Sequence, residues 1–283
     1  MSKKLFGTLT NYKKTLCDIM IVVSMPRSLR LLRVLTIVCY LFVGLATATS
    51  DIYDASNQLV MPEKLESYAL KYNVLRGGKV YGSATRTLEK DADSYVLSFE
   101  TKASFWFYEI QTRQISTFSK TDHIIMPLTY SGTDKRSFKD LQQFSLDFVH
   151  SKKEAEITDN QASTIQTFDG NLFDPLLSYE VLRFLLDSDN ASKIGDQFFL
   201  RVMDKKGAVN YRFVNDGQYQ LDTPFGSVFC TKITRIRENS KRRTHIWFAV
   251  DYDNIPVKVL QEKDNEEIAT LEILNVDKAL IQN

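Results

Sequence analysis

Residues 68–88 read YALKYNVLRGGKVYGSATRTL, two runs rich in aromatic and β-branched residues on either side of Gly77-Gly78. Both glycines can adopt a positive φ at no steric cost, which is what the tight turn of a β-hairpin requires. The stretch therefore predicts two antiparallel strands joined at the glycines. A third run, Tyr95–Thr101, alternates apolar and polar side chains and predicts a further strand.

Short alternating runs separated by turns continue almost to the C-terminus. Connectors such as 204–207 and 251–254 are rich in Asp, Asn, Lys and Gly, which favour tight turns. So many strands need a barrel, a half-barrel or a sandwich to hide their edges. We expect a mainly β protein, an antiparallel β-barrel or half-barrel with one packed amphipathic helix. Further strands are expected at 111–118, 124–131, 144–150, 154–158, 164–168, 197–203, 209–214, 219–221, 227–236, 244–250, 256–261 and 268–276, with a turn at 215–217.

One segment, DPLLSYEVLRFLL at 174–186, departs from the two-residue period. Asp174 suits the N-cap position of a helix, and Pro175 suits the first helical position. A set of apolar residues recurs at a spacing of three or four and shares one helix face. These residues are Leu177, Val181, Leu182, Leu185 and Leu186. The segment predicts one amphipathic helix whose apolar face closes one end or face of the sheet.

The N-terminal region has the three parts of a secretory signal. A basic start at 25–33 is followed by the apolar run Val34–Leu45 and by the small-x-small site Ala46-Thr47-Ala48. We expect Met25 to be the true start, cleavage after Ala48 and export to the periplasm. The alternative is a membrane anchor, but this apolar run is shorter than the ~20 residues that a spanning helix needs.

The expected organisation has three parts: an N-terminal extension with the signal peptide at 1–48, a polar leader at 49–64 and a single β-rich domain at 65–280. The chain holds 36 Lys and Arg and 35 Asp and Glu, of which 7 and 1 precede residue 49. The remaining 29 basic and 34 acidic residues give a net charge of −5, which is atypical of a nucleic-acid-binding protein. Only Cys230 remains after cleavage, so we expect no internal disulfide and a buried thiol.

No nucleophile, phosphate-binding or dinucleotide-binding motif is present in the sequence. His123, His150 and His245 have no second ligand at the spacing of a metal site, and zinc would need three or four ligands. We therefore expect no enzyme activity, no metal and no cofactor.

Four consecutive aromatic residues, Phe105-Trp106-Phe107-Tyr108, exceed what an ordinary strand needs. In a strand, Phe105 and Phe107 would share one face, and Trp106 and Tyr108 the other. One interpretation is a strand buried on both faces. The other is that one face lines a cavity, or forms an exposed patch, that receives an amphiphile or a partner. Since Trp and Tyr combine an apolar body with a polar tip, we expect Trp106 and Tyr108 to face the binding space, with all four residues as candidate ligand contacts.

Six short motifs occur in a characteristic order: GGKVYG at 77–82, FDPLLS at 173–178, DTPFG at 222–226, RTHIWFA at 243–249, IPVKV at 255–259 and LEI at 271–273. Over about residues 65–280 the chain resembles an exported bacterial family catalogued as domain of unknown function 3108. The resemblance implies an antiparallel β-barrel-like fold in the periplasm of a Gram-negative bacterium, and it implies no reaction. The chain departs from the family pattern by one extra residue within Asp174–Ser178.

Trp247 lies in a run of alternating apolar and polar residues, so we expect its side chain to anchor the core.

We expect an exported cell-envelope protein that binds a lipid, another amphiphile or an envelope partner protein, and no nucleic acid. The alternative is a structural or assembly factor without a small ligand, and a hydrolase ranks third. A large apolar cavity would favour the first, a filled core with one exposed apolar patch the second, and acids or histidines clustered in a cleft the third.

Overall fold

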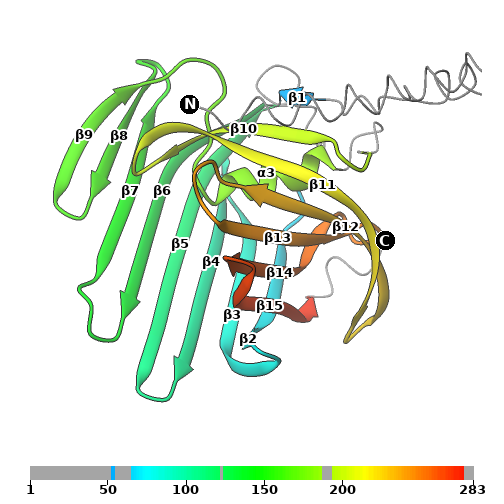
Figure 1. Cartoon of the computed structure of the whole chain (residues 1–283). Coiled ribbons are helices and arrows are strands. Elements are labelled where there is room, and N and C mark those ends of the chain that lie inside the picture. Colours follow the sequence, from blue (N-terminus) through cyan, green and yellow to red (C-terminus); the bar gives the residue numbers. More distant parts are fainter. Residues whose placement is uncertain (1–51, 55–64, 122–123, 187–192, 277–283) are drawn as a thin grey trace, which may run out of the picture. The chain divides into compact units, whose positions relative to one another are not determined.

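The computed structural model describes residues 52–54, 65–121, 124–186 and 193–276 (Figure 1). The predicted signal peptide, most of the polar leader and His123 lie outside these residues. The described part contains one α-helix, α3 (Leu177–Leu185), and fifteen strands. The strands are β1 (Ile52–Asp54), β2 (Tyr68–Arg76), β3 (Lys79–Asp91), β4 (Ser94–Phe105), β5 (Tyr108–Thr121), β6 (Ile124–Arg136), β7 (Gln142–Val149), β8 (Glu154–Asp159), β9 (Ala162–Thr167), β10 (Gln197–Asp204), β11 (Gly207–Thr223), β12 (Gly226–Ile236), β13 (Arg242–Ala249), β14 (Ile255–Lys263) and β15 (Glu266–Val276).

All strands belong to one sheet with the order β1-β10-β11-β12-β13-β14-β15-β2-β3-β4-β5-β6-β7-β8-β9. Neighbouring strands are antiparallel except β1, which pairs parallel with β10. The last strand, β15, pairs with β2, so the two halves of the chain join in the middle of the sheet. The connection from β9 to β10 therefore crosses from one end of the sheet to the other, and it carries α3 through the curve of the sheet (Figure 1).

The two ends of the sheet approach each other. The Lys205 ammonium, after β10, forms an ion pair of 2.6 Å with Asp159 at the end of β8. The side chain of Gln166 on β9 lies against Gly207, where a Cβ would come within 2.4 Å of its Oε1 atom. Phe173 also forms a parallel bridge with Val202 on β10. The predicted mainly β fold with one packed helix is confirmed, in a barrel-like form.

The glycine hairpin is confirmed, with φ values of 56° and 75° at Gly77 and Gly78. The helix also forms, although it begins at Leu177, and Asp174 supplies the predicted cap because its Oδ1 atom accepts hydrogen bonds of 2.9 Å from the N–H groups of Leu176 and Leu177. The helix is not simply amphipathic. Glu180 is completely buried and Arg183 is nearly so, among the apolar residues of the core.

One detail of the strand prediction is wrong. Residues 209–221 form one continuous strand, because a bulge between Asn215 and Gly217, with φ of 105° at the glycine, absorbs the expected turn. Trp247 packs against the core as expected, although it is only partly buried, and the ammonium groups of Lys232 and Lys258 lie 5.5 and 5.8 Å from its ring centroid.

Within the described residues, α3 is too short to cross a bilayer, and no other helix there could do so.

Candidate functional site

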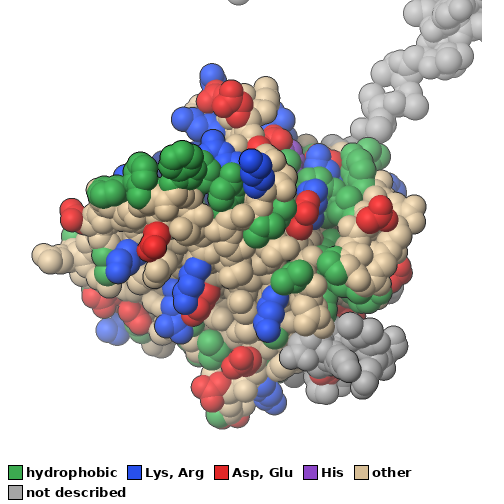
Figure 2. Space-filling model, turned by 90° about the horizontal axis from the view of Figure 1, so that it is seen from below, with side chains coloured by type: hydrophobic (Ala, Val, Ile, Leu, Met, Phe, Trp, Pro, Cys, Tyr) green, Lys and Arg blue, Asp and Glu red, His purple; other side chains and the backbone are tan. Residues whose placement is uncertain are grey.

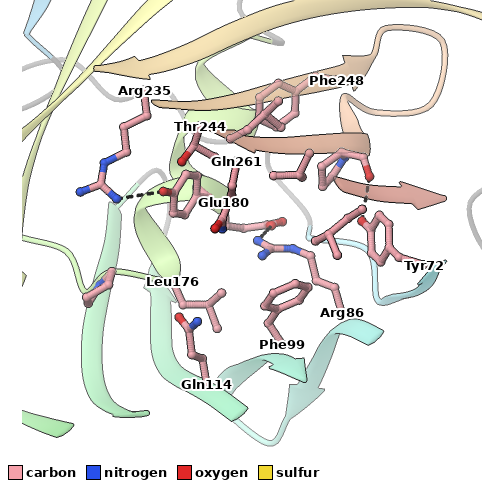
Figure 3. A pocket seen from close by; sticks show the side chains of 16 residues that line it. Tyr72, Arg86, Phe99, Gln114, Leu176, Glu180, Arg235, Thr244, Phe248 and Gln261 are labelled. Atoms are coloured by element: carbon pink, nitrogen blue, oxygen red, sulfur yellow. Dashed lines mark hydrogen bonds and ion pairs between the residues drawn. The ribbon is translucent and has the colours of Figure 1, made fainter. Parts of the chain in front are cut away.

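A cavity of about 230 Å³ lies beside α3, between strands of the two halves of the sheet (Figure 3). Its apolar wall is made by Phe99, Leu176, Ile246, Phe248, Val259 and Leu271. Its polar groups include Arg86, Gln114, Tyr179, Glu180, Arg235 and Gln261. The volume is slightly below the range of about 300–1,000 Å³ that is usual for small-molecule sites. The cavity therefore has room for one small ligand or for the end of a larger one.

An ionic cluster forms the floor of this cavity. Glu180 accepts a hydrogen bond of 2.7 Å from Arg86, one of 2.9 Å from Arg183, and a third of 2.7 Å from the hydroxyl of Tyr68. Burial alone would raise the pKa of Glu180, but Arg183 and Arg86 outweigh burial and lower the pKa to about 2. Two guanidinium groups face one carboxylate, so the cluster carries a net positive charge.

Arg235 stands on the opposite side of the cavity, on β12 (Figure 3). It donates a hydrogen bond of 2.9 Å to the hydroxyl of Tyr179, and its guanidinium lies 3.3 Å from the centroid of the Tyr211 ring. Among the described residues, its Nε atom is the buried side-chain polar atom that lacks a hydrogen-bond partner. Burial lowers the pKa of Arg235, but Tyr179 and Tyr211 outweigh burial, so the group stays charged. Arg235 thus contributes a charged guanidinium to the wall of the cavity.

Asp174 positions the helix that borders the cavity. It is completely buried, and its Oδ2 atom accepts a hydrogen bond of 2.5 Å from the hydroxyl of Ser116 on β5. Burial raises the pKa of Asp174 to about 6, although hydrogen bonds from Leu177, Ser116 and Leu176 oppose the shift. The carboxyl therefore fixes the start of α3 to the sheet, at the cost of burying an ionisable group.

The aromatic run predicted as a site lies elsewhere and is not a strand buried on both faces. Phe105 ends β4, Trp106 and Phe107 form the turn, and Tyr108 begins β5. Trp106 is 86% exposed and Phe107 is 74% exposed, so the alternation that was to place Trp106 and Tyr108 on one face does not apply. The four residues lie on a hairpin end, and none of them lines the cavity. Of the two interpretations, the exposed patch is the one that fits this position.

The described histidines and the cysteine lie within the packed strands and make local contacts there. His150 hydrogen bonds through Nε2 to the carbonyl of Pro127. His245 contacts Thr234 at 2.6 Å and Glu262 at 3.1 Å, and Thr234 is only 3% exposed, so this cluster ties β12, β13 and β14 together below the surface. Cys230 is completely buried, and burial raises its pKa to about 11. No group of metal-ligating side chains occurs in the described part of the chain.

Sequence reasoning missed the charged residues at the cavity, although two signals were present. Arg86 has the same parity in β3 as the buried Ala84 and Leu88, so the alternation already placed an arginine on the inner face. Glu180 and Arg183 stand three residues apart on a helix that is otherwise uncharged, which is the spacing of an intrahelical ion pair. Arg235 had no comparable signal, because its position depends on the long-range pairing of β12.

No curated protein matches the chain. A solved structure described as a β-barrel-like protein of domain of unknown function DUF1849 from Brucella abortus superposes with a TM-score of 0.49 at 10% identity, covering 76% of this chain and 98% of its own. The family model described as "Protein of unknown function (DUF3108)" matches residues 67–273, which is most of the chain. The chain therefore belongs to the DUF3108 family.

Proposed function

We propose that this protein is exported to the cell envelope and binds a small anionic amphiphile, one apolar chain that carries a carboxylate or phosphate group, in the cavity beside α3. The observation that carries the proposal is the pairing of an apolar wall with the charged guanidinium of Arg235 in one cavity. Export is supported by the basic, apolar and small-x-small segments of residues 25–48.

The charges of the cavity favour an anion. Glu180 is neutralised by Arg86 and Arg183, so the group at the floor adds no net negative charge. Arg235 supplies a further positive charge to the wall of the cavity. An anionic group would therefore be held near Arg235, because a guanidinium donates to carboxylate and phosphate oxygens in a fork geometry.

The apolar wall favours a ligand with a hydrocarbon part. Phe99 on β4 and Phe248 on β13 face the same space (Figure 3), and Val259 on β14 also lines it. Covering apolar surface with a chain contributes about 0.8 kcal/mol per buried CH₂ group. With about 230 Å³ available, one chain fits and a second chain does not.

The test is thermal unfolding of the purified protein with decanoate and with decanol, two probes that differ mainly in charge. We expect decanoate to raise the unfolding midpoint in a concentration-dependent way and decanol to have a much smaller effect. Arg235→Met should remove the preference for decanoate. Val259 is a partly buried residue of the cavity wall. Val259→Phe should fill the cavity with a larger side chain and abolish the effects of both probes.

The matched control is Arg113→Met, which removes an exposed arginine of β5 that pairs with Glu100 on the surface. This variant should respond to decanoate like the wild type. Equal responses to both probes, or a response that survives Val259→Phe, would show that binding occurs outside the cavity. Native mass spectrometry of protein taken from the periplasm would then identify a co-purified ligand, and protein recovered without one would favour the structural alternative.

A further inference from the structure

Three neighbouring hairpins end at the same side of the sheet. The β4–β5 turn carries Phe105, Trp106 and Phe107, and the β6–β7 turn carries Phe138, which is 83% exposed. The rings of Phe107 and Phe138 lie 6.2 Å apart, and the ring of Phe105 lies 4.9 Å from that of Tyr81 next to the β2–β3 turn. We call the ends of these three hairpins, residues 76–81, 102–109 and 134–141, the aromatic rim.

Two hydrogen bonds join the β4–β5 and β6–β7 hairpins of the rim. The N–H of Ser137 donates to the carbonyl of Glu109 at 3.0 Å, and the N–H of Glu109 donates to the hydroxyl of Ser137 at 2.9 Å. The two longer hairpins project away from α3 in Figure 1. Seen from the side to which they point, hydrophobic side chains form a row with lysine and arginine side chains close by (Figure 2).

The two most exposed aromatic residues occupy unfavourable backbone conformations. Trp106 has a φ of 58° and Phe138 a φ of 62°, in the left-handed region that turns normally fill with Gly, Asn or Asp. A bulky residue at such a position lowers stability, and strain of this kind concentrates at functional sites. Both turns thus keep a large aromatic side chain at the tip although a glycine would suit the fold better.

The charge of the rim differs from that of the rest of the protein. Its three segments contain six basic residues and three acidic ones, a net charge of +3. The carboxylate of Glu267, which accepts a hydrogen bond from Gly77, reduces this to +2. Residues 49–283 together carry −5, so the positive charge is concentrated around the exposed rings.

We propose that the aromatic rim docks the protein on the surface of a membrane that contains anionic lipids. Aromatic side chains are enriched at the boundary between headgroups and acyl chains, and basic residues beside them are attracted to anionic headgroups. The rim offers both at once, on neighbouring hairpin ends. This docking surface is separate from the cavity and goes beyond the proposed ligand binding.

Cosedimentation with vesicles tests the proposal, using protein purified from Gram-negative cells that express the full chain. We expect at least tenfold stronger binding to vesicles of equal parts phosphatidylglycerol and phosphatidylcholine than to pure phosphatidylcholine, and weaker binding in 0.5 M salt. Trp106→Gly combined with Phe138→Gly should reduce binding at least tenfold. The unfolding midpoint of this variant should stay unchanged or rise, because glycine relieves the positive φ.

The matched control is Ile165→Ser, which removes an apolar side chain that is 66% exposed on β9, outside the rim. It should leave vesicle binding unchanged. In a Trp247→Phe variant, Trp106 is the only tryptophan, and its emission should shift to the blue on phosphatidylglycerol vesicles. Unchanged binding after loss of both rings, a silent Trp106, or a rim that instead mediates contact between protein chains would overturn the proposal.

Discussion

Glu180 shows how a single buried carboxylate holds distant parts of this fold together. It joins α3 to β3 through Arg86 and to β2 through Tyr68, while Arg183 continues to the carbonyl of Asp253 at 2.6 Å. A buried ion pair contributes little relative to a well-packed apolar group, but removing one partner leaves the other charge buried and uncompensated.

Glu180→Gln should therefore lower the free energy of unfolding by about 3–5 kcal/mol, measured in urea at pH 7. The matched control is Glu100→Gln, which breaks a surface pair with Arg113 in which the side chains are 40% and 61% exposed. That variant should lose at most about 1 kcal/mol, since exposed pairs are screened by water. Similar losses in both variants would mean that the Glu180 cluster is not sealed from solvent.

The contribution of Asp174 to the stability of the fold depends on pH. Its pKa of about 6 in the folded protein lies above its ordinary value of 3.8, because burial disfavours the charged form. The folded state therefore holds the proton more tightly, so the stability contributed by protonated Asp174 is complete below pH 4 and is lost as the pH rises through 6. The difference amounts to about 3 kcal/mol.

Asp174→Asn should remove this loss, so the variant should gain about 3 kcal/mol relative to the wild type between pH 4 and pH 6.5 in urea unfolding. Asp169→Asn, at a side chain that is 90% exposed, serves as the control and should leave the pH dependence unchanged. Glu180 does not interfere, since its pKa near 2 lies below this window. Parallel curves for wild type and Asp174→Asn would contradict the assignment.

At the scale of elements, α3 acts as an internal support for the sheet. Leu177, Val181 and Leu182 are completely buried, and Phe173 and Phe184 at either end are nearly so. The helix borders the cavity through Leu176, Tyr179 and Glu180, so its position also sets the shape of the proposed binding site.

Leu182→Ala should cost about 2–5 kcal/mol of unfolding free energy, because it leaves a void that the surrounding strands fill only in part. Ile194→Ala, at a side chain that is 73% exposed, should change stability by at most about 0.5 kcal/mol. A melting temperature that barely moves in Leu182→Ala would mean that the helix lies off the core, and its apolar face would then be a partner-binding surface.

Local patterns predicted most of the elements correctly, and they failed where tertiary context decides. The Gly77-Gly78 turn and the start of α3 depend on neighbouring residues, so the sequence was sufficient. The run from Phe105 to Tyr108 has strong β propensity throughout, yet it turns between Phe105 and Tyr108, where propensity would place a glycine or asparagine. A residue kept against its local preference could not be recognised by propensity alone.

Closure of the sheet depends on contacts between residues that are distant in the sequence. The pairing of β15 with β2 joins residues about 200 positions apart, and the ion pair of Lys205 with Asp159 brings the two ends of the sheet together. Alternation of apolar and polar residues along a strand predicts which side chains share a face, but it does not predict which strands pair with each other. The mainly β class was therefore predictable, whereas the strand order and the cavity that this order encloses were not.

Whether this molecule reaches the envelope depends on residues before the described domain. If residues 25–48 are a secretory signal, the enzyme that removes it needs small side chains at Ala46 and Ala48, while Thr47 between them is free to vary. In a Gram-negative host, the wild-type chain should appear in the periplasmic fraction with Thr49 as its first residue. Ala48→Leu should block cleavage and leave a longer product in the membrane fraction, whereas Thr47→Leu should be processed like the wild type. Immunoblots of the fractions and N-terminal sequencing measure both outcomes. An uncleaved wild-type chain in the cytoplasm would refute export, and it would remove the envelope membranes as the surface on which the aromatic rim acts.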